Sequence, residues 1–206
     1  MDRSIFDGHA SERTLPGADP EFSTDAAAVQ ENIASMRVGG FTALIDTLYL
    51  GLNRMRHTQL AQRAIIVISD GADNHSRYAR GELLRIALEA DVHIYAIIVD
   101  NGVDRAGGNT LPYRPSQIRK SGDQASERAA SNILEDLASK TGGLYFHVRN
   151  AEQARDGMAK AGQALRNQYV LGYRPDEAGL AGKWRRIRVT TVPKLNVHAR
   201  SGYYAP

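Results

Sequence analysis

The chain contains no cysteine among its 206 residues. Disulfide bonds, thiolate metal sites and cysteine nucleophiles are therefore excluded. No apolar run approaches the roughly 18 residues that a membrane-spanning helix requires. The first ten residues, MDRSIFDGHA, also lack the apolar core of a secretory signal. As written, the sequence predicts a cytoplasmic chain without a membrane span; with a signal upstream in a longer protein, it would be exported or periplasmic.

A strong excess of charge of one sign is lacking as well. Lysine and arginine number 26 against 23 aspartate and glutamate residues, which gives a formal net charge of +3. One cluster of basic residues is present: Lys183, Arg185, Arg186 and Arg188. We interpret it as the solvated face of a strand rather than as a nucleic-acid site. Hydrophobic residues make up 42% and charged residues 24% of the chain, which is ordinary for a globular protein.

A short apolar run is the most informative stretch of the sequence. Residues 64–68 are apolar and mostly β-branched, and the run ends at Ser69-Asp70-Gly71. This pattern predicts a strand buried on both faces of a parallel sheet. Ligands bind at the carboxyl end of such strands, and the loop that follows carries the oxygen-bearing side chains of Asp70, Asp73 and Asn74.

Strand and helix patterns alternate on both sides of this run, which predicts an α/β fold. Residues 1–24 are poorly defined, 25–167 form the α/β domain, and 168–206 change character to alternating and aromatic runs that predict a C-terminal antiparallel β extension. Two further strands are expected at 92–99 and 144–148. Helices are expected at 25–36, 43–55, 76–90, 127–140 and 151–167.

Four segments in order resemble the second half of a von Willebrand factor A domain: GGFTALIDTLYLGL (39–52), RAIIVISDGADN (63–74), VHIYAIIVD (92–100) and LASKTGGLYF (137–146). The tail QYVLGYRPDEAGLAGKWRRIRVT resembles the C-terminal extension of a bacterial subgroup, the VWFA-related Acidobacteria type. The resemblance implies a Rossmann-like, doubly wound, mostly parallel sheet. It also implies a divalent cation at the top of that sheet, Mg²⁺ or alternatively Mn²⁺ or Ca²⁺, whose coordination a protein partner completes with a carboxylate.

The resemblance places two metal ligands, Thr42 and Asp70. A hydroxyl and a carboxylate are hard oxygen donors of the kind that Mg²⁺ prefers. From the residues alone, a helix N-cap is the preferred interpretation of Thr42, and Asp70 can equally be a turn-forming residue. Candidate accessory residues are Asp46, Asp73 and Asn74. A polar loop over 101–126 would shape partner choice through Asn101, Gly107, Asn109 and Tyr113.

The chain departs from the family in one respect. The family's first metal motif, Asp-x-Ser-x-Ser after its first strand, supplies three ligands and occurs nowhere in this sequence. Relative to this family, we therefore expect an N-terminally incomplete domain. We expect weak metal binding and, because a strand would be left with an unpaired edge, self-association through that edge.

These observations predict a non-catalytic, metal-assisted protein-binding module for adhesion or assembly. Two alternatives remain open. One is a metal-free scaffold that assembles through the sheet edge or the β tail. The other, less favoured, is a metal-dependent hydrolase using Asp70, which would need a further carboxylate from Asp73 or Asp100.

Overall fold

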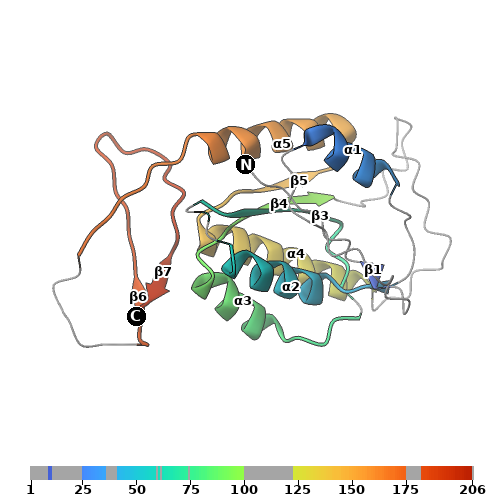
Figure 1. Cartoon of the computed structure of the whole chain (residues 1–206), viewed down its shortest axis with the longest axis horizontal. Coiled ribbons are helices and arrows are strands. Elements are labelled where there is room, and N and C mark those ends of the chain that lie inside the picture. The colour runs from blue at the N-terminus through green and yellow to red at the C-terminus, as the bar shows by residue number, and fades with distance from the viewer. Residues whose placement is uncertain are drawn as a thin grey trace.

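The structure is a computed structural model that describes residues 9–10, 25–35, 41–58, 60, 62–73, 75–99, 123–174 and 182–205. The described part has an α/β architecture, with a parallel sheet between helices and a small antiparallel sheet at one end (Figure 1). This confirms the α/β class and the antiparallel character of the C-terminal extension. No helix in these ranges is both long and apolar enough to cross a membrane.

The parallel sheet has three strands in the order β3-β4-β5. They are β3 (Ala64–Ser69), β4 (His93–Val99) and β5 (Tyr145–Val148). Because β3 and β5 both run parallel to β4, all three carboxyl ends lie at the same edge of the sheet. The loop that carries Asp70 leaves the sheet at this edge, as the sequence predicts.

Helices cover both faces of the sheet (Figure 1). On one face lie α2 (Leu44–Arg56), α3 (Arg80–Glu89) and α4 (Asp123–Thr141). On the other lie α5 (Ala151–Arg166) and α1 (Ala26–Ser35). All five predicted helices exist. The third, however, begins at Arg80 rather than at residue 76, because the preceding residues form the loop described below.

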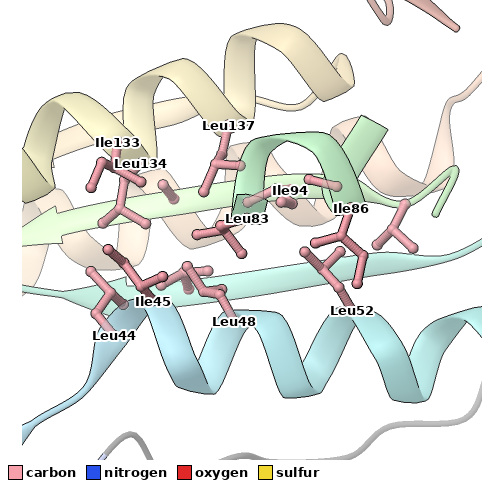
Figure 2. Close-up of a cluster of buried hydrophobic side chains, with 14 of the residues drawn as sticks. Leu44, Ile45, Leu48, Leu52, Leu83, Ile86, Ile94, Ile133, Leu134 and Leu137 are labelled. Atoms are coloured by element: carbon pink, nitrogen blue, oxygen red, sulfur yellow. The ribbon is translucent and has the colours of Figure 1, made fainter. Parts of the chain in front are cut away.

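The hydrophobic core lies between the sheet and the three-helix face. Figure 2 shows Leu48 and Leu52 of α2 pointing toward Leu83 of α3 and Ile94 of β4. Leucines spaced by one helical turn on α2 therefore supply a continuous apolar stripe, as the sequence periodicity predicts. Burying each such side chain contributes about 1.5–3 kcal/mol relative to leaving it exposed. The largest side chains that are almost fully buried are Leu52, Leu83, Val92, Ile94, Ile97, Leu134 and Leu137.

Strand β4, not β3, is the strand buried on both faces. Residues 94–98 of β4 are all buried, whereas Ile66 and Ile68 of β3 are 41% and 61% exposed. The prediction of two-sided burial for β3 is therefore wrong. The reason is that β3 forms the edge of the described sheet, while α5 packs on β4 and β5.

The C-terminal extension forms a two-stranded antiparallel sheet of β6 (Trp184–Arg186) and β7 (Gly202–Tyr204). No strand forms near residues 169–173, at the start of the predicted β extension. Tyr169, Val170 and Leu171 are 93%, 81% and 75% exposed in an extended segment. At the other end of the described chain, β1 (His9–Ala10) pairs antiparallel with β2 (Phe41–Thr42).

The extension is attached at the amino edge of the parallel sheet. The N–H of Ser201 donates to the carbonyl oxygen of Lys140 at 2.9 Å. The guanidinium of Arg200 pairs with the carboxylate of Asp91 and donates to the carbonyl oxygen of Leu88 at 2.9 Å. These contacts join the tail to the carboxyl-terminal ends of α3 and α4, at the end of the molecule away from the Asp70 loop (Figure 1).

Candidate functional site

The loop after β3 is held against the first turn of α2 by Asp73. Its Oδ1 accepts the N–H of Leu44 at 3.1 Å across 29 residues of sequence. The first N–H groups of a helix have no partner within the helix and attract negative charge. Asp73 therefore caps α2 from outside, and it ties the two segments that carry the predicted ligands into one rim.

Ser76 and Asp46 extend this connection. The Ser76 hydroxyl donates to the same Oδ1 of Asp73 at 2.6 Å and accepts the N–H of Asp46 at 3.2 Å. The Asp46 carboxylate in turn accepts the N–H groups of Arg77 and Tyr78 at 2.8 and 3.0 Å. The rings of Tyr78 and Tyr49 then stack with their centroids 3.8 Å apart. Asp73 and the segment from Ser76 to Tyr78 are thus held along the start of α2.

Asp70 lies at the carboxyl end of β3 and is half-buried. One of its carboxylate oxygens accepts the N–H of Ala72 at 3.1 Å, which closes a local turn. Gly71 sits within this turn in the left-handed region, at φ 77°. A residue with a side chain would be strained there. The turn-forming interpretation of Asp70 is therefore confirmed. Its role as a metal ligand stays a prediction.

Thr42 is half-buried and belongs to β2, where it pairs with His9. The N-cap residue of α2 is Ala43, and no side chain at that position caps the helix. The expectation that Thr42 is the N-cap is therefore wrong, because Asp73 supplies that function. Since β2 directly precedes α2, Thr42 and the Asp73-bound start of α2 share the rim with Asp70.

The donor set of this rim fits a divalent cation only in part. Across the ranges that the structure describes, no group of three or more histidine, aspartate and glutamate side chains is placed to hold a metal ion. One carboxylate oxygen of Asp46 and one of Asp73 each already accept two hydrogen bonds. These two residues therefore act as supports of the loop. Thr42 and Asp70 stay the predicted ligands, and their binding of a metal ion stays a prediction.

Several predicted site residues lie outside the described residues. This holds for the accessory candidate Asn74, for the hydrolase candidate Asp100, and for the whole proposed partner-binding loop: Asn101, Gly107, Asn109 and Tyr113.

Sequence reasoning missed Ser76, Tyr78 and Tyr49. We assigned Ser76 to the helix that follows β3, although it hydrogen-bonds to both acidic supports of the rim. One signal was available. Asp73 and Ser76 are spaced by three residues, and aspartate and serine in a polar loop readily hydrogen-bond to nearby backbone groups. The stacking of the two tyrosines had no local signal, because they lie on different elements.

Comparison with known proteins gives distant similarities. No family model matches the chain. An uncharacterised protein of Borreliella burgdorferi is 22% identical over 120 residues, which cover 58% of this chain and 34% of that protein. The chain thus spans about a third of the length of this curated relative.

Three solved structures are similar at low score. BatB, a conserved hypothetical protein from Bacteroides thetaiotaomicron, has a TM-score of 0.49 at 17% identity over 80% of this chain and 78% of that one. An aerotolerance-related membrane protein from Bacteroides fragilis has a TM-score of 0.48 at 14% identity over 72% of each chain. A membrane-spanning protein from Vibrio fischeri has a TM-score of 0.35 at 23% identity over 73% of each chain.

Proposed function

We propose that this chain is a non-catalytic protein-binding module of the von Willebrand factor A type, with a Rossmann-like, doubly wound sheet. Its binding surface is the rim formed by the loop after β3 and the start of α2. The observation that carries the proposal is the hydrogen bond from the Leu44 N–H to the Asp73 carboxylate, 3.1 Å long. That contact supports the proposal because it links the start of α2 to the loop after β3, at the carboxyl edge of the parallel sheet where α/β proteins bind their ligands.

Metal assistance at this rim would come from Thr42 and Asp70. Their hydroxyl and carboxylate oxygens would hold Mg²⁺ or Mn²⁺ with most of its water shell retained, and a carboxylate of the partner would replace one of those waters. Because Asp46 and Asp73 are engaged in supporting the loop, the ion would be held weakly. A partner carboxylate would then supply a substantial part of the binding free energy.

Isothermal titration with Mn²⁺, with and without sodium acetate as a stand-in for the partner's carboxylate, tests this function. We expect weak binding that acetate strengthens, and we expect Asp70→Asn and Thr42→Val each to abolish it. The matched control is Asp156→Asn, which removes a carboxylate that is 75% exposed on α5. Equal metal binding by the wild type and by Asp70→Asn would contradict the proposal that a metal ion is bound at this rim.

A second candidate function, metal-free assembly through the sheet edge, is favoured by the exposure of β3. This edge strand of the described sheet is apolar and β-branched, and it presents Ile66 and Ile68 to solvent. Long, apolar edge strands readily pair with a strand of another chain. Assembly by this route would be indifferent to chelators. The hydrolase alternative stays a prediction, because one of its two candidate carboxylates, Asp100, lies outside the described residues, while the other, Asp73, caps α2 with one of its oxygens.

A further inference from the structure

A groove of about 360 Å³ lies between α3 and the C-terminal sheet. Leu84 and Leu88 of α3 form one wall, while Trp184, Arg186 and Tyr204 of β6 and β7 form the other. Its volume falls in the range of small-ligand sites, about 300–1,000 Å³. The elements that line this tail groove lie at the amino edge of the parallel sheet, at the end of the molecule away from the loop after β3 (Figure 1), so the groove is separate from the rim around Asp70.

The apolar part of the tail groove is built from a fixed pair of aromatic side chains. Trp184 and Tyr204 are directly opposite each other on β6 and β7. Their ring centroids are 5.0 Å apart with an interplanar angle of 62°. The Trp184 ring packs closely over Gly202, where a Cβ would come within 2.5 Å of the ring. Trp184 and Tyr204 are 39% and 37% exposed, so part of each residue is available to a ligand.

The charged part of the tail groove is positive. Among the described residues, no carboxylate or carbonyl oxygen pairs with the guanidinium of Arg186. Lys140, also in the lining, lies 3.6 Å from the carboxylate of Asp136. That carboxylate is bound more closely by Arg80, at 2.6 Å. The groove therefore presents one unpaired guanidinium and one weakly paired ammonium beside an apolar wall.

We propose that the tail groove binds an acidic peptide segment in an extended conformation. A carboxylate of the peptide is bound by the planar guanidinium of Arg186, which is suited to bidentate pairing, with Lys140 adding positive charge. A neighbouring apolar side chain packs between Trp184 and the two leucines of α3. The lining combines two cations with four apolar or aromatic side chains, which suits a peptide that carries both acidic and apolar residues.

The same groups fit two other classes of macromolecule less well. A flat bilayer surface cannot reach leucines that form the wall of a groove, and Leu88 is only 8% exposed. Single-stranded nucleic acid binds to open aromatic faces on which bases stack. Here the two rings pack against each other at a steep angle, so the groove offers ring edges more than open faces.

The experiment uses Trp184, the sole tryptophan in the sequence, as its reporter. The full chain is titrated, by tryptophan fluorescence and by calorimetry in parallel, with an acetylated and amidated hexapeptide of alternating glutamate and leucine. The same peptide with glutamine in place of glutamate tests the charge. Vesicles of phosphatidylcholine and phosphatidylglycerol in a 3:1 ratio test the membrane alternative.

We expect the glutamate peptide to bind saturably and to shift the Trp184 emission, and the glutamine peptide to bind at least about fivefold more weakly. Arg186→Gln should raise the Kd for the glutamate peptide about five- to tenfold, the loss expected for a partly exposed charge-assisted hydrogen bond. Arg188→Gln is the matched control, because it removes an exposed cation of the same segment that does not line the groove. It should leave the Kd within about twofold.

Three results would overturn the proposal. One is the absence of saturable binding of the glutamate peptide by both methods. Another is equal loss of affinity in Arg186→Gln and Arg188→Gln, which would mean that only overall charge matters. The third is binding to the vesicles but not to the peptide. Circular dichroism of both variants verifies that the fold is intact, which is expected because both side chains are exposed.

Discussion

The carboxylate of Asp73 caps a helix that begins 29 residues earlier, through its contact with the N–H of Leu44. The helix has no side-chain cap of its own, since its N-cap residue is Ala43. One residue of the loop after β3 thereby determines where that loop lies relative to α2. Both the stability of the fold and the geometry of the candidate site should therefore depend on this contact.

Replacing Asp73 with alanine should lower the free energy of unfolding by about 1–2 kcal/mol, the usual cost of losing a helix cap. The variant should also release Ser76, whose hydroxyl bonds to the same oxygen. Urea denaturation measures the change, and Asp156→Ala on α5 serves as a control that removes a 75% exposed carboxylate. An unchanged midpoint in Asp73→Ala would show that the cap makes no net contribution.

Thr141 is the buried polar residue that connects α4 to the central strand. Its hydroxyl accepts the N–H of Ile94 at 3.0 Å and donates to the carbonyl oxygen of Leu137 at 2.7 Å. Thr141→Val keeps the shape and leaves that N–H without a partner in the interior. The expected cost is about 1–3 kcal/mol, measured by urea denaturation. Thr58→Val, at a less buried hydroxyl that also donates to a helix carbonyl, is the comparison and should cost less.

Arg200 should be the main attachment of the tail to the domain. Its guanidinium pairs with Asp91 and donates to the carbonyl oxygens of Leu88 and Gly202, at 2.9 and 3.1 Å. Arg200→Met should loosen β6 and β7 while the parallel sheet persists. Faster proteolysis within residues 182–205 and a red shift of the Trp184 emission would report this.

The matched control for that variant is Arg166→Met. It removes a cation from the exposed end of α5, for which no ion pair is present among the described residues. Proteolysis of the tail at the wild-type rate in Arg200→Met would mean that the backbone contacts of Ser201 suffice to hold it.

The exposed edge of β3 should govern any self-association. Ile68→Lys places a charge where the side chain is 61% exposed, so it should cost little stability and disfavour pairing with another strand. Light scattering with EDTA present should show a shift toward monomer in this variant. Ile33→Lys, at a 56% exposed position on α1, is the control and should leave the oligomeric state unchanged. A wild type that is monomeric at all concentrations would exclude assembly through this edge.

Much of the fold follows from local patterns. The leucine spacing of α2 and the polar cap Asn150 of α5, whose Oδ1 accepts the N–H of Gln153 at 2.9 Å, were both readable from neighbouring residues. The burial of the two faces of β3 could not be read from neighbouring residues. A β-branched run records that a strand forms, but whether its two faces are covered depends on elements distant in the sequence.

The candidate site, like the fold, was predictable from the sequence only in part. The position of Asp70 at the carboxyl edge followed from the turn signal after β3. The roles of Asp73 and Asp46 as supports did not, because each bonds to backbone groups about thirty residues away. For Thr42, the local pattern predicted a capping role that the residue does not have. A hydroxyl before a helix is a good local cap, yet a carboxylate from another loop supplied that function.

The burial of β4 has a consequence for the order in which the molecule opens. β4 alone in the described sheet has a strand on both sides and helices over both faces, whereas β3 and the tail each lack cover on one side. Local opening should therefore begin at these margins. In native-state hydrogen exchange, the amides of residues 94–98 should be the last to exchange, and those of 184–186 and 202–204 among the first.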